Sequence, residues 1–228
     1  MAKSRVLKRM AIAAAIIVGA FLCAIVVALV MLQGKTAALH DDWRAILDDP
    51  RYATAVSVEG VEPITQDVSC GYAVIEMFSA WDGGDVTEES LYNEYGRVVT
   101  STGKSFCDEM NKRFPAYTTT FRSYLTDSEL ISQVYDRLSD GIPVPVEWAA
   151  QLDGEWTLHY SLITGIDIPG DKITVVNPYG YVEELLLSDF LKRTSFEAYE
   201  GMPIFLKLGF AFGLFEENAI FTIQRVGQ

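Results

Sequence analysis

Histidine, cysteine and basic residues are scarce in this chain. Of its 228 residues, two are histidine, His40 and His159, and three are cysteine. No Cys-x-x-Cys pair is present and the region after residue 40 has a single histidine, so a zinc site there would lack ligands. Neither a phosphate-binding glycine loop nor a Gly-x-Ser-x-Gly elbow occurs. The sequence therefore implies no metal and no cofactor.

The basic residues are also unevenly placed. Residues 1–39 hold five Lys and Arg and no acid, which leaves the rest of the chain with 13 bases, 31 acids and a formal charge of −18. Such a surface repels nucleic acid and anionic lipid headgroups, and no basic patch interrupts it. We interpret the acidity as a source of solubility and expect no nucleic-acid partner.

Charge is absent altogether from residues 10–32, which are almost entirely Ala, Ile, Val and Leu. As a helix this stretch would span about 34 Å, enough to cross a bilayer core. Four basic residues precede it and only Lys35 follows closely, so the positive-inside rule places the N-terminus in the cytoplasm. We expect a cytoplasmic tail at 1–9, a single-pass transmembrane anchor from Met10 to Leu32, and an outward-facing remainder.

A cleavable signal peptide is the alternative to a retained anchor. Thr36-Ala37-Ala38 is a weak small-residue cleavage pattern, although the apolar core is much longer than the usual 7 to 15 residues or so. Cys23 lies in the apolar stretch and is interpreted as a packing residue, which leaves Cys70 and Cys107 outside it.

The remaining chain has no internal repeat or low-complexity linker, so we expect a lead-in at 33–61 and one globular domain at 62–228. Apolar spacing and N-cap residues predict helices at 41–52, 70–81, 87–96, 104–113, 126–140 and 188–192. Short β-rich runs predict an antiparallel meander from strands at 142–148, 158–167 and 172–177. A lead-in strand at 53–61 and a last pair of strands at 203–212 and 219–226 complete the prediction. We interpret the phenylalanines near the C-terminus of the chain as core residues.

Four residues carry the chemistry suggested by this sequence. Gln66, Cys70, His159 and Asn177 follow one another in the order in which a cysteine hydrolase supplies oxyanion donor, nucleophile, base and base-orienting amide. Cys70 would occupy the first turn of a helix, whose dipole lowers a thiol pKa from about 8.5. Asn177 ends the strand after that of His159, so a hairpin can bring the two side chains together. Taken singly, each residue also suits a surface, core or turn position.

These residues and their surroundings resemble a known family. Gln-x-x-x-Cys-Gly-x-Ala at 66–73, the apolar helix after it, and the segments 141–144, 159–167, 173–180 and 188–190 are similar to the bacteriocin-leader (double-glycine) peptidase-like branch of the papain-like cysteine peptidases. The resemblance covers about residues 62 to 195. It implies a papain-like α+β fold with Cys70 as nucleophile, His159 as general base and acid, Asn177 orienting His159, and Gln66 in the oxyanion hole.

The resemblance also leaves differences. The family often has an aspartate where Asn177 stands, and members that mature bacteriocins are usually fused to an ATP-driven exporter and work in the cytoplasm. Cleavage after a Gly-Gly leader is therefore not carried over, and we expect a peptide or protein substrate at a bacterial cell envelope.

Two alternatives to an outward-facing cysteine peptidase or amide hydrolase stay open. One is a surface binding module that keeps the scaffold while a disulfide ties Cys70 to Cys107. The other is an acyltransferase, in which an amine rather than water resolves the thioester.

Overall fold

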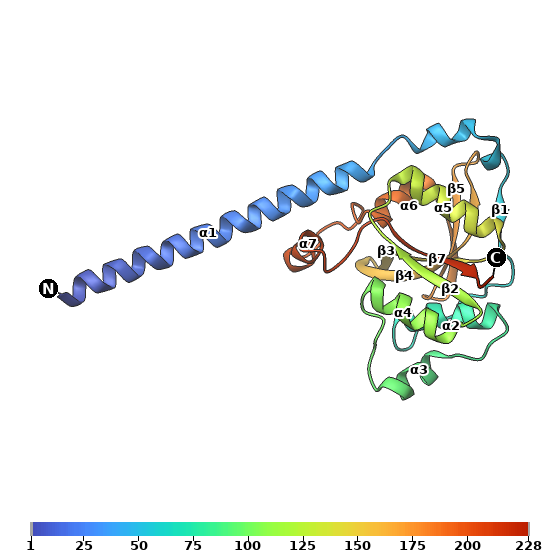
Figure 1. Cartoon of the computed structure of the whole chain (residues 1–228), viewed down its shortest axis with the longest axis horizontal. Helices are drawn as coiled ribbons and strands as arrows, with labels where there is room; N and C mark the ends of the chain where they lie inside the picture. Colours follow the sequence, from blue (N-terminus) through green and yellow to red (C-terminus); the bar gives the residue numbers. More distant parts are fainter. Residues whose placement is uncertain (1, 228) are drawn as a thin grey trace.

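A computed structural model describes residues 2–227 of the chain. Its N-terminal helix, α1 (Ala2–Leu39), extends away from an α+β domain as a single long rod (Figure 1). Large apolar side chains along α1, among them Ile16, Phe21 and Val26, are more than half exposed. Such a helix is costly in water and suits an apolar surrounding.

Most helices of the domain begin and end where the sequence predicts. Thr87 and Thr126 cap their helices through capping boxes, and Gly96 ends α3 in the left-handed conformation at φ 64°. The elements after α1 are η1 (Trp43–Asp48) and η2 (Pro50–Tyr52), both 3-10 turns, then α2 (Cys70–Trp81), α3 (Glu88–Tyr95), α4 (Gly103–Arg113), α5 (Asp127–Ser139), α6 (Leu187–Thr194) and α7 (Ile204–Ala211).

A seven-stranded antiparallel sheet forms the centre of the domain, in the order β2-β7-β3-β4-β5-β6 with β1 paired to β4. The predicted meander is confirmed as β3, β4 and β5. The strands are β1 (Val56–Ser57), β2 (Tyr117–Arg122), β3 (Val144–Leu152), β4 (Glu155–Asp167), β5 (Lys172–Asn177), β6 (Tyr181–Leu186) and β7 (Ala219–Arg225).

Helices cover both faces of this sheet (Figure 1). On one face α2 and α4 pack their side chains, such as Phe78 and Phe106, against Leu162 and Phe221 of the strands. On the other face α5 and α6 pack Leu130 and Phe190 against the sheet. Burial on both faces explains why seven consecutive residues of β3 are buried.

The segment 203–212 is the main error of the sequence prediction, because it forms helix α7 rather than a strand. Pro203 stands at its N-cap, and Gly209 and Phe210 turn toward the domain. The strand that pairs with β7 is instead β2, which the sequence analysis did not identify. The C-terminal phenylalanines also divide: Phe210 and Phe221 are core residues, whereas Phe205 and Phe212 are exposed.

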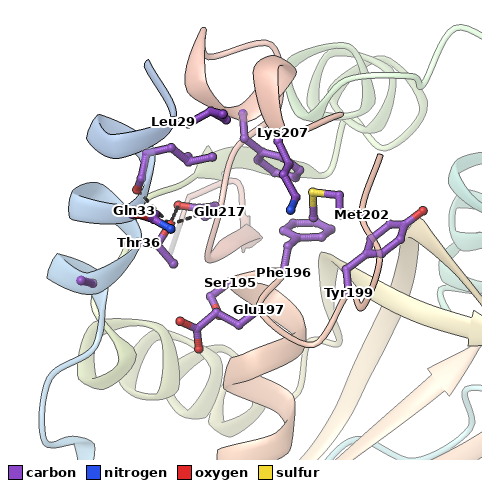
Figure 2. Close-up of a pocket in the computed structure, with 13 residues that line it drawn as sticks. Leu29, Gln33, Thr36, Ser195, Phe196, Glu197, Tyr199, Met202, Lys207 and Glu217 are labelled. Atoms are coloured by element: carbon purple, nitrogen blue, oxygen red, sulfur yellow. Dashed lines mark hydrogen bonds between the residues drawn. The ribbon is translucent and has the colours of Figure 1, made fainter. Parts of the chain in front are cut away.

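The end of α1 is fastened to the domain rather than separated from it by a flexible linker. Thr36 Oγ1 donates to a Glu217 carboxylate oxygen at 2.8 Å (Figure 2), and His40 Nδ1 lies 2.9 Å from Asp127 Oδ2. The predicted lead-in at 33–61 thus includes the last turns of α1 and the strand β1.

Candidate active site

Cys70 is the first residue of α2 and follows the N-cap residue Ser69, whose hydroxyl accepts the Tyr72 N–H at 3.2 Å. The loop before it is held by the buried carboxylate of Glu88. Glu88 accepts the backbone N–H groups of residues 67, 68 and 69 at 3.0, 2.9 and 3.0 Å. A single side chain therefore fixes the path of the chain between Gln66 and Cys70.

Gln66 lies at the junction of this loop with the turn after β5. Its backbone N–H donates to the Pro178 carbonyl at 2.8 Å, and Thr65 forms an isolated β-bridge with Tyr179. The side-chain Oε1 of Gln66 is buried and has no partner among the described residues. This junction brings the oxyanion candidate next to the segment that carries Asn177.

His159 and Asn177 are brought together as the sequence predicts. His159 Nε2 lies 2.9 Å from Asn177 Oδ1, and both side chains are buried. Because an amide oxygen only accepts hydrogen bonds, Nε2 carries the proton and Nδ1 is left as the basic nitrogen. The geometry therefore sets the tautomer that a general base requires.

The amide of Asn177 is itself held in one orientation. Its oxygen also accepts the Tyr179 N–H at 3.0 Å, and its Nδ2 donates to Glu183 Oε1 at 3.0 Å. Arg193 donates in turn to the other oxygen of Glu183 at 3.2 Å. Glu183 has no recognisable signal in the sequence, because its place beside Asn177 depends on the pairing of β5 with β6.

The ring of Tyr179 stacks on His159, with ring centroids 4.2 Å apart and an interplanar angle of 22°. Burial lowers the pKa of His159 to about 4, and the hydrogen bond to Asn177 opposes this in part. At neutral pH the imidazole is therefore uncharged and able to accept a proton.

The pKa of the Cys70 thiol is raised, mainly by burial and also by the negative charge of Glu147, while the backbone of Tyr160 and Gly71 offsets part of the increase. The backbone N–H groups at the start of α2 lower this pKa in the direction we expect of a helix N-terminus, but desolvation of the thiolate outweighs them, so the net pKa is raised. Among residues 2–227, no hydrogen bond links Cys70 Sγ to His159. At neutral pH the Cys70 thiol and the His159 imidazole are therefore both uncharged.

Cys70 opens into a cleft of about 370 Å³. Its walls come from the start of α2, the segment 98–101, the strands β3 and β4, and the α7 region, which contributes Phe205, Leu206 and Phe215. Glu147 and Tyr160 face each other across β3 and β4 and also line the cleft. Burial raises the pKa of Glu147 to about 8, a property that depends on strand register and was not apparent in the sequence.

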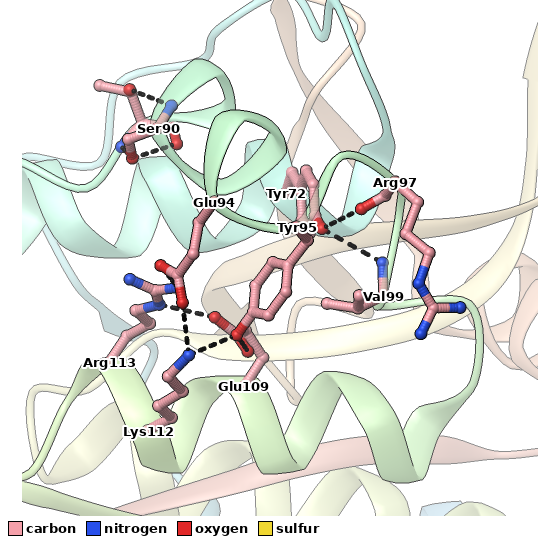
Figure 3. A network of polar contacts seen from close by, with 10 residues as sticks. Tyr72, Ser90, Glu94, Tyr95, Arg97, Val99, Glu109, Lys112 and Arg113 are labelled. Carbon is pink, nitrogen blue, oxygen red and sulfur yellow. Dashed lines mark hydrogen bonds and ion pairs between the residues drawn. The ribbon is translucent and has the colours of Figure 1, made fainter.

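A polar network supports the wall of the cleft formed by residues 98–101. Tyr72 of α2 donates its hydroxyl to the Arg97 carbonyl at 2.8 Å and accepts the Val99 N–H at 3.2 Å (Figure 3). Thr100 then packs directly over Gly71, where a Cβ atom would collide with the threonine side chain. The space above Gly71 is therefore filled by Thr100 and is not open to a substrate.

Cys70 and Cys107 are both free thiols. Cys107 lies on α4 and its thiol donates to the Thr119 carbonyl at 3.3 Å, so the alternative of a Cys70–Cys107 disulfide is not supported. No group of three or more metal-ligating side chains occurs within the part of the chain that the structure describes.

The structure has a helical stretch, Ile12–Asp48, that is long and apolar enough to cross a membrane, with a mean hydropathy of 3.1 in its most apolar window. This property is shared by membrane anchors and signal sequences. The stretch coincides largely with α1 and with the predicted anchor.

A family model described as the Peptidase_C39 like family matches residues 58–202. Among solved structures, the chain is similar to a double glycine motif protease from an AMS/PCAT transporter, crystallised in complex with the leader peptide. The two share 11% sequence identity at a TM-score of 0.42, and the match covers 75% of this chain and 99% of the other. No curated protein matches the chain.

Proposed function

The chain belongs to the Peptidase_C39 like family, and from this premise we propose that it is a membrane-anchored cysteine peptidase whose α+β domain faces outward. The family assignment confirms the resemblance and the papain-like α+β fold predicted from the sequence. The observation that carries the proposal is the 2.9 Å contact between His159 Nε2 and Asn177 Oδ1 beside the helix that begins at Cys70.

Because the resting site holds a neutral thiol and a neutral imidazole, the thiol has to lose its proton to a general base during its attack on the substrate. As a peptide carbonyl carbon meets Cys70 Sγ, the thiol proton passes to His159 Nδ1 and the S–C bond forms. The Cys70 N–H and the Gln66 side-chain amide would stabilise the oxyanion. Collapse breaks the C–N bond, and the amine leaves with the proton held by His159.

Water then resolves the thioester formed at Cys70. The water oxygen attacks the carbonyl carbon while His159 Nδ1 accepts a proton from the water. The S–C bond then breaks, the carboxylic acid product leaves, and the proton returns from His159 to the Cys70 sulfur. Asn177 keeps Nε2 protonated throughout, so the same nitrogen serves both half-reactions. The substrate is a peptide or protein that reaches the cleft.

The test compares the full-length wild type with Cys70→Ala and with Cys107→Ala, each reconstituted in bilayer nanodiscs and incubated with a mixed peptide library. We expect new cleavage products for the wild type and for Cys107→Ala, the matched loss of a second thiol, and none for Cys70→Ala. Product masses also show whether water or an added amine resolves the thioester. Full hydrolysis by Cys70→Ala would contradict the proposal.

The proposal also predicts the pH dependence of hydrolysis. Because the pKa of His159 is lowered to about 4, its basic form persists to a lower pH than the ordinary histidine value of about 6.5 allows. We therefore expect the acid limb of the kcat/KM profile near pH 4 rather than near 6.5, measured on a peptide found in the library.

A further inference from the structure

The α7 region presents an apolar surface that the domain does not cover. Four side chains form this surface, which we call the α7 apolar face: Ile204, Phe205, Phe212 and Leu214, exposed by 56%, 68%, 66% and 65%. Four large apolar side chains gathered on one short segment exceed the scattered apolar exposure expected of a soluble surface. The surface therefore calls for an apolar partner.

The segment that carries this face is fixed to the domain. Phe210 is buried and packs on Phe196 and Phe215, with ring centroids 4.7 and 5.5 Å apart. Gly209 lies so close to Phe215 that a Cβ atom there would collide with the ring. The four exposed side chains are thus held outward by a packed base.

The α7 apolar face lies next to α1. In Figure 1, α7 protrudes from the domain on the side where α1 leaves it, toward the N-terminus. The two helices are in contact, and a cavity of about 430 Å³ lies beside their contact; Figure 2 shows Leu29, Gln33 and Thr36 of α1 facing Phe196 and Lys207 across it. Leu29 is inside the charge-free run that ends at Leu32, so α7 packs beside the outer end of the apolar part of α1.

The charges near this face match the headgroup level of a bilayer. Lys207 is exposed on α7, and Lys35 follows the apolar run of α1 by three residues, or about 5 Å of helix. Lysine side chains at such a depth extend to phosphates while their stems stay in the apolar region. Lys207 therefore lies where a bilayer would accept it, whereas Lys35 Nζ lies 5.7 Å from the centre of the Tyr124 ring, and Glu197 and Glu217 line the cavity between α1 and the α7 region.

We propose that the α7 apolar face inserts into the outer interfacial layer of a phospholipid bilayer beside α1. This proposal rests on the membrane anchoring given under "Proposed function". Because Phe205 and Leu206 of α7 also line the Cys70 cleft, insertion would place one rim of that cleft at the membrane surface. Polypeptide segments at the membrane surface are then the substrates best placed to enter.

The test uses the full chain in nanodiscs of palmitoyl-oleoyl phosphatidylcholine, with the photoreactive residue p-benzoylphenylalanine introduced at one position at a time. The positions are Phe212 on α7, Phe21 inside the apolar part of α1, and Tyr92 on α3, a control that is 44% exposed. After irradiation, intact-mass spectra reveal the species captured by each probe.

We expect a mass shift of one phosphatidylcholine for probes at Phe21 and Phe212 and no such shift at Tyr92. A lipid adduct at Phe21 without one at Phe212 would overturn the insertion of α7 while leaving the anchor intact. Capture of a second copy of the chain at Phe212 would overturn it in favour of a dimer contact. Absence of lipid adducts at Phe21 as well would overturn the anchoring, and the insertion with it.

Discussion

A carboxylate at position 183 explains why this chain has an amide at position 177. Asn177 presents an acceptor to His159 and a donor to Glu183, and an aspartate supplies no donor. An aspartate at position 177 would therefore place two carboxylates at hydrogen-bond distance. The identity of one catalytic candidate is thus tied to a neighbour on the next strand.

Asn177→Asp is expected to lower the free energy of unfolding by about 1–3 kcal/mol through carboxylate repulsion, which Arg193 relieves only in part. Adding Glu183→Gln returns a donor to the pair and should recover most of this loss. Urea unfolding of the two single variants and the double variant measures the coupling. Additive effects would show that residues 177 and 183 do not interact as described.

Glu147 predicts a second effect, on the pH dependence of stability. Its pKa is raised in the fold to about 8, so the folded state binds a proton more tightly than the unfolded state between about pH 4.5 and pH 8. Stability from this group is full below pH 4.5 and is lost as pH rises, by about 1.4 kcal/mol per unit in that window. Glu147→Gln removes the titrating group.

Thermal unfolding from pH 4 to pH 9 should therefore show Glu147→Gln gaining stability over the wild type as pH increases. Glu155→Gln, an exposed change on the adjacent strand, is the control and should show no such trend. Above about pH 8, where Glu147 is ionised, the loss of its negative charge should also speed alkylation of the Cys70 thiol. A constant difference across the pH range would contradict the buried acid.

At the scale of elements, Glu88 of α3 holds the loop that leads into α2. Glu88→Ala leaves three backbone N–H groups without their acceptor and is expected to destabilise the fold by about 2–4 kcal/mol. Because Gln66 belongs to this loop, kcat should fall even where the protein is fully folded. Glu89→Ala, which changes an exposed neighbour, should leave both quantities near wild type.

The elements that sequence predicted well are those with local signals. Helices α2, α3 and α5 begin after Ser69, Thr87 and Thr126, whose side chains cap them. Strand β2 was missed although its threonines favour a strand, because its partner β7 is about a hundred residues away and no local hairpin marks it. The phenylalanine-rich α7 was taken for a strand because exposed and buried phenylalanines are indistinguishable in sequence.

The candidate site divides in the same way. The contact between His159 and Asn177 was predictable because the two residues lie on neighbouring strands of a hairpin, and the roles of Gln66, Cys70, His159 and Asn177 stay a prediction. Glu147 and Glu183 were not readable, since only strand register places them beside the site. The raised pKa of Cys70 depends on burial, a property of the whole packed domain.

At the scale of the molecule, the basic residues in the first turns of α1 and the acidic domain after α1 predict the orientation in the membrane. Alkaline phosphatase fused after Gln228 should be active in bacterial cells, since it folds only outside the cytoplasm, whereas a green fluorescent protein fusion there should stay dark. Fusions after Arg9 without the rest of the chain provide the reversed control. A fluorescent C-terminal fusion would contradict an outward-facing domain.

The fastening of α1 to the domain has a geometric consequence. Thr36 is hydrogen-bonded to Glu217 and His40 to Asp127. These contacts restrict rotation of the domain relative to α1. An embedded α1 would therefore hold Cys70 at one fixed height above the lipid. The distance of a peptide bond from the membrane would then decide whether the enzyme can cleave that bond, in addition to the side chains on either side of the bond.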